Sequence, residues 1–122
     1  NLGNMVIGYT TAKGVNGVPE QQLNLMKAFL QGSVYCWCKN CKGQWFAARD
    51  LVGGDNYFWQ NTPLMPLFEH FYQENADSDY AITEAGKAVG RLLLGVLIDD
   101  RRTFETRDGY TREYRWTGEE DL

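Results

Sequence analysis

Three cysteines stand close together in the pattern Cys36-x-Cys38-x-x-Cys41. Thiolates bind zinc well, but a zinc site here would need a fourth ligand. The chain has one histidine, His70, and lacks the second cysteine pair of a zinc ribbon. The pattern therefore favours a small buried apolar role for Cys36 or Cys38 over a metal or redox site, and we expect no cofactor. An odd, crowded set of thiols also indicates a reducing, cytoplasmic setting.

Basic side chains gather near the C-terminal end of an acidic chain. The net charge is −4, yet residues 101–116 (RRTFETRDGYTREYRW) hold five of the twelve Lys and Arg residues. Such a basic segment suits phosphate groups, because each Lys or Arg that neutralises a phosphate adds a salt-dependent gain in affinity. The three acids within it, Glu105, Asp108 and Glu113, offer the other explanation, which is local ion pairing.

Motifs of catalysis are lacking in the sequence. It contains no Gly-rich phosphate loop, no G-x-S-x-G and no His-Glu-x-x-His pattern. A single histidine on a helix is more often structural than catalytic, and Asp99-Asp100 is explained as a helix end followed by two arginines. We therefore predict that the chain is not an enzyme. No apolar run reaches the length of a membrane span, so we expect no membrane contact.

The order of predicted elements is helix, short strand, helices, then a hairpin. A helix opens at Pro19, a short aromatic strand covers residues 44–47, and a short helix from Arg49 stops at Gly53-Gly54. Thr62-Pro63 predicts the start of a helix over 62–74. Asp77, Ser78 or Asp79 is expected to cap the next helix, which runs to about residue 98. The fold class is therefore α+β.

The helix that ends near residue 98 is amphipathic. Its apolar side is predicted to comprise Ile82, Ala85, Val89, Leu92, Leu93 and Val96. Gly86 and Gly90 lie on one flank, where each costs about 1 kcal/mol relative to Ala. We expect a closely packed neighbour there as compensation.

After this helix, Asp108-Gly109 predicts a two-residue hairpin turn. That turn pairs Glu105 with Arg112 and Thr103 with Tyr114, and a longer loop that shifts the register by one residue remains open.

This order resembles a winged helix-turn-helix domain. The resemblance rests on AGKAVGRLLL, residues 85–94, as a recognition helix, followed by the C-terminal β-hairpin at 101–116 as its wing; WFAARDL, residues 45–51, resembles the first strand entering the second helix. It covers residues 19–117, preceded by a lead-in at 1–18 and followed by an acidic tail at 118–122. Two features depart from the family pattern: the segment at 53–74 is long, and the isoelectric point of about 4.9 is low.

The resemblance implies binding of double-stranded DNA, with the recognition helix in the major groove and the wing on the backbone or a minor groove. The residues that this implies as DNA contacts are Tyr80, Thr83, Glu84, Lys87, Arg91, Arg101, Arg102, Arg107 and Arg112. A solvated helix face and arginines that guard a sheet edge against aggregation are the simpler explanations.

The alternative function is a protein-docking or dimerisation module of the same fold, without nucleic acid. Tyr57-Phe58-Trp59 is the candidate contact patch, or else a lid on the core.

Overall fold

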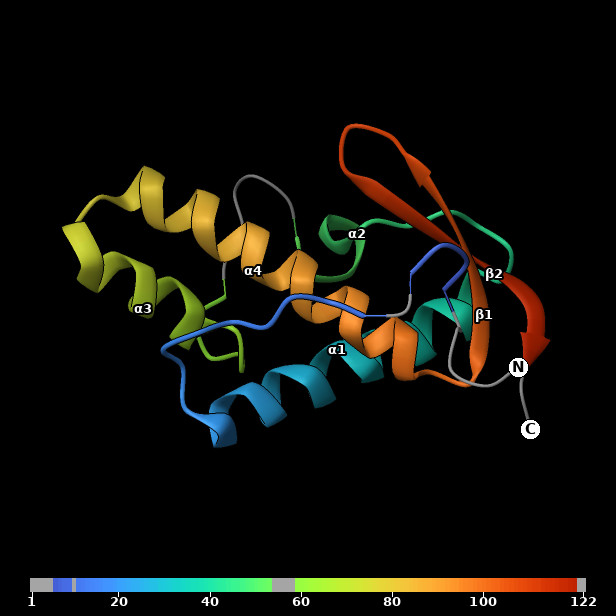
Figure 1. Cartoon of the computed structure of the whole chain (residues 1–122), viewed down its shortest axis with the longest axis horizontal. Coiled ribbons are helices and arrows are strands. Elements are labelled where there is room, and N and C mark those ends of the chain that lie inside the picture. Colours follow the sequence, from blue (N-terminus) through green and yellow to red (C-terminus); the bar gives the residue numbers. More distant parts are fainter. Residues whose placement is uncertain (1–5, 10, 54–58, 121–122) are drawn as a thin grey trace.

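The computed structural model describes residues 6–9, 11–53 and 59–120. Its helices are α1 (Glu20–Asn40), α2 (Ala48–Val52), α3 (Met65–Asn75) and α4 (Ser78–Asp99). They are followed by an antiparallel hairpin of β1 (Arg102–Asp108) and β2 (Arg112–Glu120) (Figure 1). Helices followed by a C-terminal hairpin confirm the predicted α+β class. No helix in the described ranges is long and apolar enough to cross a membrane.

Helix α4 forms the centre of the fold, with α3 and α1 packed against it (Figure 1). Asp77 caps it as predicted, because its Oδ1 accepts hydrogen bonds from the backbone N–H groups of Asp79 and Tyr80 at 2.9 and 3.2 Å. The apolar side is buried and includes all the predicted core residues except Ile82, which is half-buried. The buried residues of α4 are Ala81, Ala85, Ala88, Val89, Leu92, Leu93, Val96 and Leu97.

The helix starts and stops follow the predicted signals with one shift. α1 begins directly after Pro19 and continues unbroken through Gly32. α2 ends at Gly53, as the glycine pair indicated. α3, however, begins at Met65 and not at Thr62-Pro63, because Thr62 forms a turn in which its Oγ1 accepts a hydrogen bond from the Leu64 N–H at 3.2 Å.

The register of the hairpin differs from the prediction. Glu105 lies opposite Arg115, and Tyr114 lies opposite Thr106, so the expected Glu105–Arg112 and Thr103–Tyr114 pairs are wrong. The strands are joined by the three residues 109–111 in place of a two-residue turn. The predicted pairing would put Phe104 and Tyr114 on opposite faces of the ribbon. Burial of both rings in one core therefore excludes the predicted pairing.

Both edges of the hairpin receive a further strand residue. Phe46 bridges Tyr114 on β2, with reciprocal backbone hydrogen bonds of 2.8 and 2.7 Å. Val6 bridges Phe104 on β1, and the Ile7 N–H donates to the Phe104 carbonyl at 3.0 Å. The short strand predicted at 44–47 is thus reduced to one bridge. That bridge nevertheless joins the segment before α2 to the last strand of the hairpin, a pairing compatible with a winged-helix layout.

The predicted lead-in at 1–18 and the predicted tail at 118–122 both contribute described residues to the fold. Val6, Val15 and Val18 are buried, and Figure 1 shows the segment at 11–18 lying across α4. At the other end, β2 extends to Glu120, past the predicted boundary at residue 117. The core therefore uses residues from nearly the whole described chain.

Among the described residues, no close neighbour compensates for the glycines of α4. A methyl group added at Gly86 or Gly90 would meet no described atom within 4 Å, so the expectation of a closely packed helix there is wrong. Both glycines lie on the accessible side of the helix. Their cost in helix propensity is therefore not offset by packing within the described part of the chain.

Gly86→Ala and Gly90→Ala should each stabilise the protein by about 0.5 to 1 kcal/mol, since Ala loses less backbone entropy in a helix and meets open space here. Urea unfolding followed by circular dichroism measures the change. Gly17→Ala is the matched control and should destabilise, because Gly17 has φ +85° and a methyl group there would stand 2.6 Å from His70 Cε1. A loss of stability in both helical variants would contradict the expectation.

Candidate nucleic-acid interface

One face of α4 stays outside the core and carries the predicted helix contacts. Thr83 and Lys87 are exposed, while Tyr80, Glu84 and Arg91 are half-buried on the same side. Partial desolvation, followed by the nearby carboxylates of Glu74 and Glu84, raises the pKa of Tyr80. The helix therefore brings the five predicted residues together on one face.

The two cations of this face differ in their partners. Lys87 Nζ lies 3.2 Å from Glu84 Oε2, an exposed pair one helical turn apart. Such surface pairs contribute about 0 to 1 kcal/mol, so Lys87 can exchange this partner at little cost. Arg91 makes no ion pair with any residue in the described ranges. The α4 face therefore presents two cations that could bind a phosphate group.

The hairpin arginines are largely neutralised by their own neighbours. Arg107 pairs with Glu113, Arg115 Nη2 lies 2.9 Å from Glu105 Oε1, and Arg112 Nη2 lies 3.6 Å from Asp108 Oδ1. Three of the five arginines are thus balanced by the three acids that the sequence indicated. Arg101, at the junction with α4, is exposed.

Arg102 is a structural residue in this arrangement. Its Nη1 donates to both carboxylate oxygens of buried Asp100, at 3.0 and 3.1 Å, and its guanidinium lies over the rings of Tyr35 and Trp116. The side chain is only 15% exposed. A phosphate cannot reach the guanidinium without breaking this contact, so the geometry removes Arg102 from the set of surface contacts.

Aromatic rings lie against arginine side chains over the hairpin and its edges. The sequence analysis did not predict these contacts. The guanidinium groups of Arg107 and Arg115 lie over the ring of Trp45, with centroid distances of 4.2 and 4.7 Å. Arg112 lies 4.5 Å from the centroid of Tyr9, and Arg49 of α2 lies 5.2 Å from that of Tyr110. The partners come from distant parts of the chain, so no local pattern could have found these pairs.

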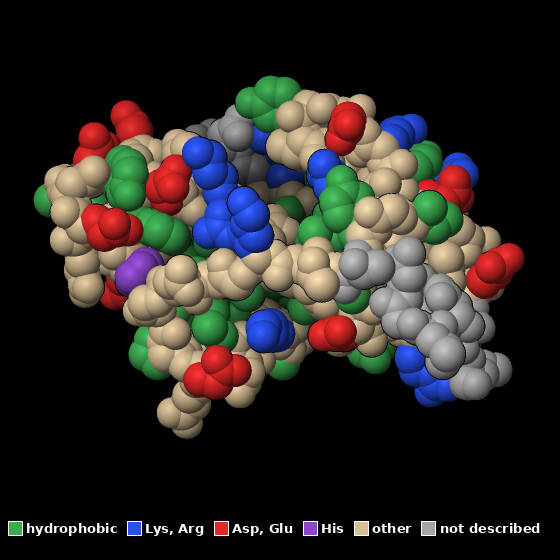
Figure 2. Space-filling view, in the orientation of Figure 1, with side chains coloured by type: hydrophobic (Ala, Val, Ile, Leu, Met, Phe, Trp, Pro, Cys, Tyr) green, Lys and Arg blue, Asp and Glu red, His purple; other side chains and the backbone are tan. Residues whose placement is uncertain are grey.

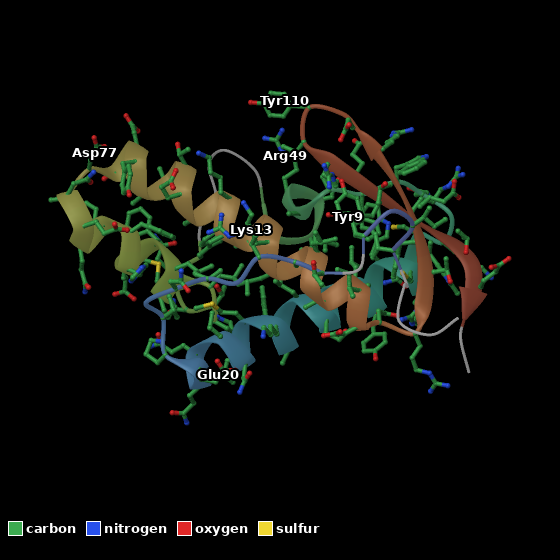
Figure 3. All side chains as sticks on the ribbon, in the orientation of Figure 1. Tyr9, Lys13, Glu20, Arg49, Asp77 and Tyr110 are labelled. Carbon is green, nitrogen blue, oxygen red and sulfur yellow. The ribbon has the colours of Figure 1, made fainter. Side chains whose placement is uncertain are left out.

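Several of these side chains share one face of the molecule. Figure 2 shows Lys and Arg side chains gathered in the upper middle of this view, beside a hollow next to the hairpin. In the same orientation, Figure 3 places Lys13 on the segment that crosses α4, Arg49 and Tyr110 at the hairpin tip, and Tyr9 between them and the hairpin base. Lys13, Arg49, Tyr9 and Tyr110 therefore lie on the same face of the molecule.

The cysteines lie away from this face, at the end of α1. Cys38 is buried, as expected of a small apolar residue, and burial raises the pKa of its thiol to about 11. Cys36 is exposed and Cys41 is half-buried. Among the described residues, no group of three or more His, Cys, Asp or Glu side chains is arranged to hold a metal ion.

A mostly apolar groove of about 610 Å³ runs between α1 and α2. The outward side of α1 forms one of its borders. Its lining includes Phe29, Gly32, Cys36, Trp37 and Leu51. Of the aromatic patch proposed from the sequence, Trp59 is buried, and residues 57 and 58 lie outside the described ranges. Within the described ranges, this groove is an apolar surface open to a partner.

No protein-family model matches the chain, and neither a curated protein nor a solved structure is significantly similar to it.

Proposed function

We propose that the protein binds double-stranded DNA through the outward face of α4 and the tip of the hairpin. The observation that carries this proposal is that α4 keeps Lys87 and Arg91 outside the core while the hairpin follows it directly. A helix with an open polar face enters a major groove, and the adjoining hairpin reaches the backbone beside it. The strand bridge between Phe46 and Tyr114 supports the same layout.

Charge distribution gives the binding an orientation. The start of α4 and the end of α3 carry Glu74, Asp77, Asp79 and Glu84, and these acids repel phosphate groups. Arg107 and Arg115 are themselves partly exposed and pair with half-buried carboxylates, so each can exchange its carboxylate for a phosphate at a modest cost. With a net charge of −4, non-specific affinity is weak and falls steeply with salt.

Replacing both Lys87 and Arg91 by Ala should weaken duplex binding and reduce the slope of log Kobs against log [salt]. The expected reduction is about 0.9 for each phosphate that is no longer neutralised, or about 2 for both. Fluorescence anisotropy of a labelled duplex over a salt series measures the slope. The matched control is Lys27→Ala with Lys39→Ala, which removes the same charge from exposed positions on α1 and should leave the slope unchanged.

A second candidate function is self-association through α1. Its outward side carries Leu25, which is 59% exposed, followed by Ala28, Gly32 and Cys36 beside the groove. The only charged residues of α1 are Glu20, Lys27 and Lys39, so an antiparallel copy would bring the acidic first turn near the basic last turn. Absence of DNA binding by the parent protein, together with a dimer in sedimentation that Leu25→Glu dissociates, would favour this function over DNA binding.

A further inference from the structure

The hairpin tip presents an aromatic ring that the fold does not use. Tyr110 is 86% exposed, more than any other large hydrophobic side chain in the described ranges. It adds almost nothing to the core, so its burial does not explain its place in the sequence. A large aromatic ring at the end of a protruding ribbon is in a position to reach into a ligand (Figure 3).

The Tyr110 ring contacts a side chain from another element of the fold. The loop at 109–111 is closed by a hydrogen bond from the Gly109 N–H to the Thr111 carbonyl at 3.1 Å. From α2, the guanidinium of Arg49 lies 5.2 Å from the ring centroid of Tyr110. An arginine over one side of the ring favours that orientation only modestly at an exposed site, and the high exposure leaves the other side open to solvent.

A second pair of the same kind lies nearby on this face. Arg112, the first residue of β2, lies over the ring of Tyr9 at 4.5 Å, and Figure 3 shows Tyr9 on the same side of the molecule as Arg49 and Tyr110. Aromatic rings interleaved with arginines are the usual means by which proteins bind unstacked bases, since every base has a face that can stack.

From this geometry we infer that the preferred ligand is DNA with unpaired nucleotides next to a duplex, and that Tyr110 stacks on the first unpaired base. A base inside an intact duplex has both faces covered by its neighbours, so the ring has access to a base that has left the stack and is unpaired beside the duplex. Arg49 then supports the ring from behind, and α4 holds the adjoining duplex. This inference rests on the proposed function.

The test compares a blunt-ended duplex with the same duplex carrying a short single-stranded overhang, by fluorescence anisotropy. The protein should bind the overhang DNA about tenfold more tightly, the lower part of the range for one stacked base. Tyr110→Ala should abolish this preference, whereas Tyr110→Phe should retain it. Tyr72→Ala, which removes another exposed tyrosine from α3, is the control and should also retain it.

A fluorescent base analogue at the first unpaired position gives an independent readout, because stacking on Tyr110 should quench it in the parent and not in Tyr110→Ala. Equal affinity for blunt and overhang DNA would overturn this inference and leave the proposed function standing. Binding of neither DNA would overturn both. If Tyr110→Ala still prefers overhang DNA over blunt DNA, other residues bind the overhang, and the proposed role of Tyr110 is overturned.

Discussion

Asp100→Ala should lower the free energy of unfolding by about 3 to 5 kcal/mol, the usual cost of removing one partner of a buried ion pair. The Asp100 side chain is 1% exposed and is surrounded by donors. Its Oδ1 accepts from the Arg102 backbone N–H at 2.8 Å and from Nη1 at 3.0 Å, while Oδ2 accepts from Gln31 Nε2 at 2.8 Å. The carboxylate thus joins the end of α4, the start of β1 and the middle of α1.

The loss of stability is large because the Arg102 side chain stays largely buried after the Asp100 carboxylate is removed. Its guanidinium would stay enclosed between the rings of Tyr35 and Trp116 without a counter-charge, and its Nε already has no hydrogen-bond partner among the described residues. Urea unfolding measures the effect. Asp99→Ala, at the exposed neighbouring position, is the matched control and should change stability by no more than about 0.5 kcal/mol.

A double variant separates the ion pair from the packing. Asp100→Leu with Arg102→Met replaces both charges by apolar groups and should recover most of the stability lost in Asp100→Ala, since buried pairs are often replaced without loss. A loss below about 1 kcal/mol for Asp100→Ala would contradict the role of this pair in fixing the hairpin to the helices.

Phe46→Ala is expected to cost about 3 to 5 kcal/mol, the range for truncating a buried aromatic residue. Phe46 is 0% exposed. Its ring centroid lies 5.6 Å from that of Trp37, 6.2 Å from Phe104 and 6.0 Å from Tyr114. One side chain therefore connects α1 with both strands of the hairpin, and its removal leaves a cavity at their meeting point.

Trp45→Ala provides the comparison, because Trp45 is adjacent in sequence but half-buried, with the guanidinium groups of two surface arginines over its ring. It should cost less than half as much in urea unfolding. Near-ultraviolet circular dichroism should also change more for Phe46→Ala, since the aromatic cluster loses its centre. Equal effects of the two substitutions would show that Phe46 is not the residue that holds the hairpin in place.

Short-range signals determined much of the fold. The Asp77 cap, the spacing of apolar residues in α4, Pro19 before α1 and Gly53 after α2 all act within a turn or two of the chain. These features could therefore be predicted from the sequence, and the structure agrees with the predictions. The outward face of α4 followed from the same periodicity, so the helix half of the proposed interface could be predicted.

Only the tertiary structure decided which groups meet. Burial of Phe104 and Tyr114 in one core excluded the predicted pairing, and in the observed register Glu105 lies opposite Arg115 and pairs with it. The same contacts placed Val6 in the core and Arg49 against Tyr110. These partners are far apart along the chain and meet because folding buries apolar surface, a condition that no local pattern encodes.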